Sequence, residues 1–329
     1  MKPNTDSHSK SPLLPIIRAL GANLGIAIAK TITAVMTGSG AMMAESIHSY
    51  ADCANQILLL IGLKESKAPE TEEHPLGHGR VMYFYSLLVG MMLLLVGGAF
   101  SIYKGVEHFI NPEHLNSSDI IYAIAVLIIS ILLEGYALRG ALQHIKTERK
   151  GKSLIRWFKE TRSSEMLIVA GEDVTAITGL LFAFFALILA WVTGDARWDA
   201  VGSIGVGALL MAVAVFLILE IKSLIVGESA SPEKVQAMEA FVESQPEVKT
   251  LYRLITLQWG SRVIALIQAE MNKTGSENGL IDATNMVEQK LKKAFPEIKY
   301  TFFEPDRGRE IHEYEDEEDE DKEKQLQTS

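Results

Sequence analysis

Six long apolar segments between residues 13 and 226 constrain the fold of this chain more than any other feature. A helix needs roughly 20 predominantly apolar residues to cross the hydrocarbon core of a bilayer. To bury six such helices in a soluble core would require a very large protein, whereas this chain has 329 residues. We therefore expect a multi-pass membrane protein in the lipid bilayer, with transmembrane helices at 13–36, 41–62, 81–110, 118–143, 164–193 and 198–226.

Lysine and arginine predict the orientation of these helices. The loop after the fourth segment, "HIKTERKGKSLIRWFKETR", is strongly basic, and the loop after the second contains Lys64, Lys67 and Arg80. Positively charged loops stay on the cytoplasmic side of a membrane. Both termini are therefore expected in the cytoplasm. A bacterial inner membrane is the expected location, because no Arg-rich, acid-poor presequence is recognised.

The rest of the chain has the pattern of a soluble domain. Residues 229–305 predict helix, strand, strand, helix and strand, with a hairpin turn at Gly260–Ser261. We expect a six-helix domain at 13–228, preceded by a cytoplasmic segment at 1–12 and followed by this α+β domain. The stretch "EYEDEEDED" supplies eight of the acids behind the net charge of −10. Residues 306–329 are expected to be a disordered acidic tail, and the near-neutral remainder predicts no nucleic-acid partner.

The second apolar segment contains ionisable residues that a membrane helix normally excludes. His48 and Asp52 are four residues apart, so they share one face of a helix, and Glu45 lies on nearly the same side. An ionisable side chain within a membrane costs several kcal/mol by most scales, so these residues predict a functional site with a partner.

The fifth apolar segment offers that partner in Glu172 and Asp173. Neighbouring residues of a helix diverge by about 100°, so we expect only one of the two to face His48 and Asp52. A nitrogen donor with carboxylates suits a divalent transition metal, zinc above all. The alternative is a set of polar groups that hydrogen-bond between helices without a metal.

Three motifs extend this pattern in order along the chain: "TGSGAMMAESIHSYADCANQ", "HPLGHGR" and "EDVTAITG". Together they resemble the cation diffusion facilitator family of metal transporters, over about residues 13 to 305. The pairing of "HSYADCANQ" with "EDVTAITG" is most similar to the branch of the family that contains zinc transporter nine. The resemblance implies six transmembrane helices, a cytoplasmic ferredoxin-like domain that dimerises, and a homodimer.

The resemblance also implies a transport site made by His48, Asp52 and Asp173. The fourth ligand position of the family falls on Val169, which cannot bind a metal. Glu172, Glu45 or water could complete the shell. Because harder ions accept more oxygen ligands, Mn²⁺, Fe²⁺ or Co²⁺ become alternatives to Zn²⁺.

A second, weaker site is conceivable in the loop "EEHPLGHGR", where His74 and His78 are four residues apart. Some relatives hold a metal in this loop, with an aspartate at the position that is Thr71 here. The alternatives are a structural turn and a weak ion-collecting site.

Glu134, in the fourth apolar segment, is a further carboxylate within the membrane. It could relay protons together with His48, or pair with a basic residue such as Lys30. Asn23 and Asn55 are expected to make hydrogen bonds between helices rather than to bind the metal.

The predicted function is a divalent metal cation/proton antiporter that moves zinc or a similar ion out of the cytoplasm, with no resident cofactor. A metal binds neutral imidazole and ionised carboxylates, so its binding and release are linked to protons. The direction of transport is implied by the resemblance. We expect no enzyme, because no HExxH motif is present. The alternative is a non-transporting membrane scaffold or a metal-binding regulatory protein.

Overall fold

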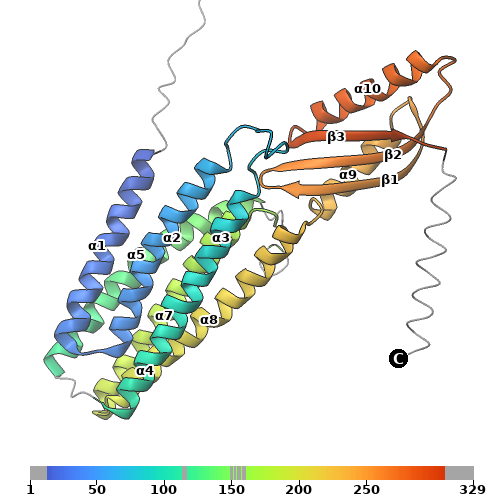
Figure 1. Ribbon diagram of the computed structural model, residues 1–329. Coiled ribbons are helices and arrows are strands. Elements are labelled where there is room, and N and C mark those ends of the chain that lie inside the picture. Colours follow the sequence, from blue (N-terminus) through green and yellow to red (C-terminus); the bar gives the residue numbers. More distant parts are fainter. Residues whose placement is uncertain are drawn as a thin grey trace, which may run out of the picture. The chain divides into compact units, whose positions relative to one another are not determined.

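The computed structural model describes residues 13–112, 117–148, 151, 153, 157 and 161–307 (Figure 1). The predicted N-terminal segment 1–12 and residues 308–329 of the predicted acidic tail lie outside the described residues. The chain divides near Lys222 into a helical unit and a C-terminal unit.

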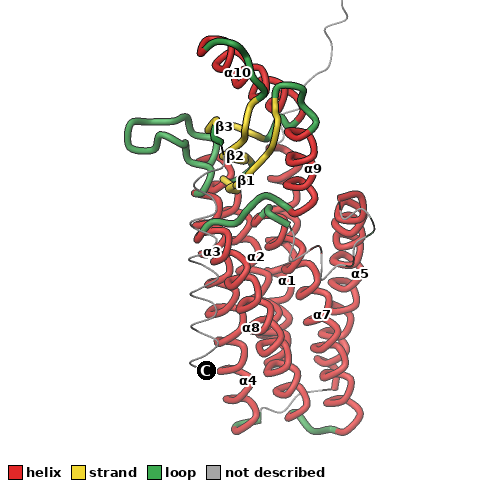
Figure 2. The backbone as a smooth tube through the Cα atoms, turned by 90° about the vertical axis from the view of Figure 1, so that its right-hand side faces the viewer, coloured by secondary structure: helices red, strands yellow, loops and turns green. Residues whose placement is uncertain are grey.

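The helical unit consists of long helices, red in Figure 2, that correspond to the apolar segments. Its elements are α1 (Leu13–Thr37), α2 (Gly40–Glu65), α3 (Val81–Met92), η1 (Leu93–Ala99), α4 (Phe100–Ile110), α5 (Ser117–Glu148), α7 (Ser164–Thr193) and α8 (Arg197–Val226). The elements α3, η1 and α4 follow one another without a break, and η1 is a π-helical stretch. The third predicted transmembrane segment therefore contains a local widening of the helix.

By length and composition, three helical stretches of the described chain are apolar enough to cross a membrane: Val81–Ile110, Ser164–Thr193 and Arg197–Val226. Helices α1 and α5 contain shorter apolar stretches, Asn23–Thr37 and Ile120–Tyr136. Helix α2 has the length, but its ionisable residues lower its hydropathy. The six-span topology stays a prediction.

The start of α2 is held by α8. Gly38, with a φ of 68°, forms the turn after α1, and Ser39 caps α2 by accepting a hydrogen bond from the Met42 N–H. The buried Asp199 carboxylate of α8 accepts hydrogen bonds from the Ser39 hydroxyl and the Gly40 N–H, both at 2.6 Å. A carboxylate at a helix N-terminus also interacts favourably with the helix dipole. These bonds fix α2, which carries most of the polar residues of interest, against α8.

The C-terminal unit has the predicted order of elements. It consists of α9 (Pro232–Glu243), β1 (Val248–Trp259), β2 (Arg262–Met271), α10 (Glu277–Ala294) and β3 (Ile298–Pro305). Strand β2 is central, antiparallel to β1 and parallel to β3. Gly260, with a φ of 62°, lies in the predicted hairpin turn between β1 and β2. The ferredoxin-like identity of this small mixed sheet stays a prediction.

The two helices of this unit pack on one face of the sheet. Met238 of α9 and Leu291 of α10 belong to the same buried cluster as Ala265 and Ile267 of β2. Alternate side chains of a strand point to opposite faces. On the other face Ile255, Leu266 and Phe302 are exposed, with fractional exposures of 43%, 40% and 55%.

Candidate metal-transport site

Helix α2 carries a row of polar side chains along one face. Glu45, His48, Ser49, Asp52 and Gln56 follow each other at spacings of three or four residues, or are direct neighbours in the sequence. Residues at these helical spacings lie close together on the helix surface. Glu45 and His48 are at most 1% exposed, and the side chain of Asp52 is 18% exposed. The predicted shared face of His48 and Asp52 is therefore turned to the interior of the helical unit.

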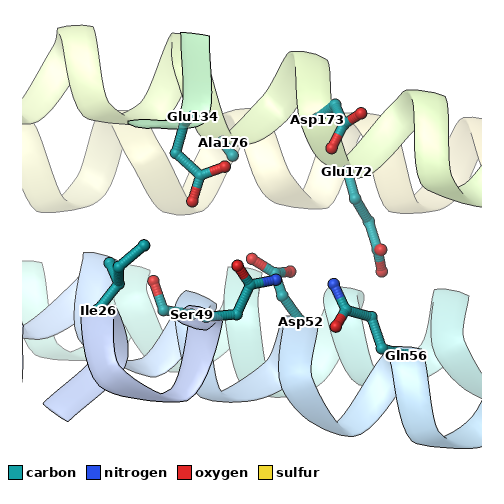
Figure 3. Close-up of a pocket in the computed structure, with 9 residues that line it drawn as sticks. Ile26, Ser49, Asp52, Gln56, Glu134, Glu172, Asp173 and Ala176 are labelled. Carbon is teal, nitrogen blue, oxygen red and sulfur yellow. The ribbon is translucent and has the colours of Figure 1, made fainter. Parts of the chain in front are cut away.

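A cavity lies between four helices at this face (Figure 3). It is lined by Asn23 and Ile26 of α1, by Ser49, Asp52 and Gln56 of α2, by Glu134 of α5, and by Glu172, Asp173 and Ala176 of α7. Figure 3 shows the carboxylates of Asp52, Glu134 and Glu172 directed toward the space between the helices. The structure thus places Asp52, Asp173, Glu172 and Glu134, all predicted from the sequence, at one cavity.

Both acidic residues of α7 line this cavity, which differs from the expectation that only one of them faces α2. The longer side chain of Glu172 extends toward α2, where its Oε1 accepts a hydrogen bond of 2.6 Å from the Asn55 Nδ2. This bond confirms the predicted role of Asn55 between helices. The angle of about 100° separates the Cβ atoms of Glu172 and Asp173 around the helix axis. The long side chain of Glu172 can still reach the cavity in spite of this separation.

His48 is buried and is not one of the residues that line the cavity. Its Nδ1 lies 3.5 Å from Asp52 Oδ1, too far for a good hydrogen bond. Within the described residues, no group of three or more histidine, cysteine, aspartate or glutamate side chains is arranged so that it could hold a metal ion. A shell made by His48, Asp52 and Asp173 therefore requires side-chain movement, and this ligand set stays a prediction.

Several buried polar atoms along α2 make no hydrogen bond. They are Glu45 Oε1, both ring nitrogens of His48, Asp52 Oδ1 and Asn55 Oδ1. A buried polar atom without a partner costs about 1–3 kcal/mol. Buried polar atoms of this kind require a partner such as water or an ion.

Lys30 of α1 does not pair with Glu134, which was one of the two possibilities raised for Glu134 from the sequence. Its Nζ lies 3.2 Å from Glu45 Oε2 and donates a 2.9 Å hydrogen bond to the Ser49 hydroxyl, instead of forming an ion pair with Glu134. Glu134 lines the cavity from α5. Lys30 and Ser49 are both close to the site, and their partners depend on the rotation of α1 against α2, which the sequence does not define.

The other candidate residues lie away from the cavity. Val169, at the fourth ligand position, is 42% exposed. His74 and His78 lie in the loop after α2 with their rings 4.6 Å apart, and His78 Nδ1 is 3.1 Å from the Pro69 carbonyl oxygen. That bond supports a structural turn, and a weak ion site in this loop stays a prediction.

Three polar lining residues were not among the predicted site residues: Ser49, Gln56 and Asn23. Gln56 is four residues after Asp52, and Ser49 is three residues before it, so the helical spacing could have identified both. Asn23 was expected to bond between helices, and its place at the cavity depends on the packing of α1.

Comparison with known proteins places the helical unit in a family. Residues 16–226, more than half of the chain, match the cation efflux transmembrane domain. The mitochondrial proton-coupled zinc antiporter SLC30A9 of Xenopus laevis is 32% identical over 250 residues, which cover 75% of this chain and 44% of that protein. The human SLC30A9 antiporter is 32% identical over 225 residues, 68% of this chain and 39% of that protein.

A bacterial relative matches over most of its length. The manganese efflux system protein MneP of Bacillus subtilis is 22% identical over 287 residues, 85% of this chain and 91% of that protein. This chain spans less than half the length of the SLC30A9 relatives that it matches. The match to the efflux domain and the identity with the SLC30A9 antiporters show that the chain belongs to the cation diffusion facilitator family, near its zinc transporter nine-like branch.

Proposed function

We propose that this chain is a divalent metal cation/proton antiporter that moves Zn²⁺, or Mn²⁺, Fe²⁺ or Co²⁺, out of the cytoplasm. The observation that carries the proposal is the cavity whose wall combines carboxylates of α2, α5 and α7. Acidic side chains facing a cavity inside a membrane domain mark an ion pathway. The names of the relatives, which include a proton-coupled zinc antiporter and a manganese efflux protein, support the same class of cargo.

In the proposed cycle, a hydrated cation enters the cavity and Asp52, Asp173 and His48 replace part of its water. The carboxylates must be ionised and the imidazole neutral for this step, so protons leave as the metal binds. A rearrangement of the helices then opens the cavity to the opposite side. There, protonation of His48 and a carboxylate releases the metal, and Glu134 provides a proton-accepting group in the cavity wall.

The choice between zinc and a harder cation depends on His48. The cavity wall offers the oxygens of Asp52, Glu172 and Asp173, which suit Mn²⁺, whereas an imidazole suits Zn²⁺. His48 Nδ1 lies 3.5 Å from Asp52 Oδ1, and Asp52 lines the cavity, so Asp52 is the residue through which an ion in the cavity would reach the imidazole in this proposal. Glu172, which lines the cavity, is the supplementary ligand in this proposal, whereas Glu45 does not line it and pairs with Lys30 Nζ at 3.2 Å.

A non-transporting scaffold or metal-binding regulatory protein is the second candidate function. It is favoured by the lack of a ready-made group of three metal donors within the described residues. A carrier fits the same observation if its ligands come together only when the cargo binds. Transport measurements separate the two.

The experiment is metal uptake by vesicles reconstituted with the purified chain. Zn²⁺, Mn²⁺, Fe²⁺ and Co²⁺ are compared side by side, with a pH-sensitive dye in the lumen. We expect uptake of at least one ion with proton movement in the opposite direction, and loss of both in Asp173→Ala. Glu165→Gln, an acid in the first turn of α7 outside the cavity lining, is the matched control. Uptake by Asp173→Ala at the wild-type rate would contradict the carrier mechanism.

In this proposal, the chain forms a homodimer. It lies in a bacterial inner membrane with both termini in the cytoplasm. The family supports dimerisation, and the exposed Ile255, Leu266 and Phe302 of the sheet offer an apolar surface for it. The distribution of lysine and arginine supports the orientation. Light scattering of the detergent-solubilised chain tests the dimer: Phe302→Asp should shift its mass toward the monomer, and an unchanged mass would exclude this face.

A further inference from the structure

Lys30 is an ionisable residue inside the helical unit that the proposed cycle does not use. It lies in the apolar part of α1 and is 1% exposed. Its ammonium group contacts two residues of α2, Glu45 at 3.2 Å and Ser49 at 2.9 Å. A lysine in the interior of a membrane domain is a functional candidate by default.

The charge of Lys30 is one side chain away from the cavity. Ser49, which accepts its hydrogen bond, is part of the cavity wall next to Asp52. The ammonium group interacts electrostatically with His48 and Asp52 of α2 and with Glu134 of α5. A cation in the cavity would therefore experience both the attraction of the carboxylates and the repulsion of Lys30.

Stabilisation of the fold alone does not explain the buried ion pair between Lys30 and Glu45 well. A buried ion pair is often no more stabilising than well-packed apolar residues of similar size. Glu45 accepts the contact from Lys30 through Oε2, while its Oε1 has no hydrogen-bond partner and lies against Gly179. The ion pair therefore leaves a buried carboxylate oxygen, Glu45 Oε1, without a hydrogen bond.

We propose that the Lys30–Glu45 pair sets the affinity of the cavity for divalent cations. Lys30 is a fixed positive charge that weakens metal binding enough for the ion to leave, and Glu45 is its counter-ion rather than a metal ligand. An ion pathway must bind its ion well enough to admit it and weakly enough to release it. This inference rests on the proposed function and assigns Lys30 and Glu45 as positioning residues.

The test is titration of the purified full-length chain in detergent with Zn²⁺ and, separately, Mn²⁺ at constant pH. Lys30→Met removes the repelling charge and should tighten binding on the order of tenfold. Glu45→Gln leaves Lys30 unbalanced and should weaken binding by a similar factor. The double variant Lys30→Met/Glu45→Gln restores the net charge and should bind within about threefold of wild type. Lys30→Arg keeps the charge and should bind like wild type.

The decisive result is tighter metal binding by Lys30→Met together with weaker binding by Glu45→Gln. If the ion pair were only structural, both variants would change the affinity in the same direction, or neither would change it. If Glu45 were a ligand, the double variant would bind as weakly as Glu45→Gln, and the proposal would be overturned. If Lys30→Met does not fold, comparison of Glu45→Gln with the double variant still isolates the Lys30 charge. Failure of the wild type to bind either ion would instead contradict the proposed function.

Discussion

Asp52 connects the buried and the open parts of the site. Its Oδ1 lies 3.5 Å from the Nδ1 of the fully buried His48, and its side chain also forms part of the cavity wall with Glu172 and Asp173. An ion held by Asp52 would therefore be within reach of nitrogen on one side and of carboxylate oxygens on the other. The proposed preference for zinc therefore depends on whether His48 takes part in binding.

Replacement of His48 by asparagine tests this dependence. The variant keeps a polar side chain but removes the imidazole, which is a better ligand for zinc than for manganese. We expect Zn²⁺ uptake by reconstituted vesicles to fall at least tenfold, which corresponds to about 1.4 kcal/mol, while Mn²⁺ uptake falls less. Equal losses for the two ions would show that His48 does not distinguish them.

The sequence predicts some of these residues well and others poorly, for a physical reason. The four-residue spacing of His48 and Asp52 defines a shared helical face without any knowledge of the fold. The partner of Lys30, and the presence of both Glu172 and Asp173 at one cavity, depend on how the helices are rotated against each other. Rotation is determined by packing over whole helices, so local spacing could not predict these contacts.

Among the elements of the helical unit, α8 approaches η1 and α4 unusually closely. A Cβ atom on Gly207 of α8 would lie 2.8 Å from the carbonyl oxygen of Gly98 in η1 and 2.8 Å from the backbone nitrogen of Ile102 in α4. Close backbone approach at small residues is a common way for membrane helices to associate. The π-helical stretch η1 contains Gly98, so the irregular part of the helix lies at this contact.

Gly207→Ala should therefore separate α8 from η1 and α4. The two close neighbours are backbone atoms that cannot rotate away, so we expect a loss of roughly 1–3 kcal/mol of stability. Gly25→Ala on α1 is the matched control, because its added Cβ meets nothing within 4 Å and alanine favours a helix. Thermal unfolding in detergent should show a lower Tm for Gly207→Ala alone; equal Tm values would contradict the close contact.

The boundaries of the elements follow from the apolar pattern, whereas the π-helical stretch does not. The expected segments at 13–36 and 81–110 agree closely with Leu13–Thr37 and with the continuous stretch from Val81 to Ile110. The sequence "LLLVGGA" has no charge or proline that would indicate η1. Gly98 of η1 contacts α8, and a contact between segments so far apart in the sequence cannot be predicted from local residue patterns.

Over the whole molecule, each unit contains a buried apolar cluster, and the polar features of the two units differ. The helical unit encloses the polar cavity, whereas the C-terminal unit has ion pairs at its surface. Lys290 donates to both carboxylate oxygens of Glu247, at 2.8 and 3.0 Å. Glu270 accepts from Lys249 at 2.7 Å and from the Tyr252 hydroxyl at 3.0 Å. The order of elements in this unit was predictable from local patterns, but these pairs were not.

These ion pairs predict a pH dependence for the C-terminal unit. The hydrogen bond from Lys290 lowers the pKa of Glu247, and those from Lys249 and Tyr252 lower the pKa of Glu270. A lowered pKa in the folded state stabilises the fold above the ordinary glutamate pKa of about 4.3, and this contribution is lost as the pH falls further. Both groups are near solvent, so the effect is small.

Hydrogen–deuterium exchange of β1 and β2 in the full-length chain measures this effect, after correction for the intrinsic rate at each pH. Protection should decrease between pH 5 and pH 3, and less so in the double variant Glu247→Gln/Glu270→Gln. Protection that is constant or rises toward pH 3 in the wild type would contradict the prediction.

We propose that the cavity between α1, α2, α5 and α7 binds the cargo ion through Asp52 and Asp173. Equilibrium zinc binding by the purified variant Asp52→Asn/Asp173→Asn tests this proposal, with Glu165→Gln as the control. Two neutral amides in place of two carboxylates should weaken binding at least tenfold, while the control binds like the wild type. Wild-type affinity in the double variant would place the metal elsewhere in the protein and overturn the proposal.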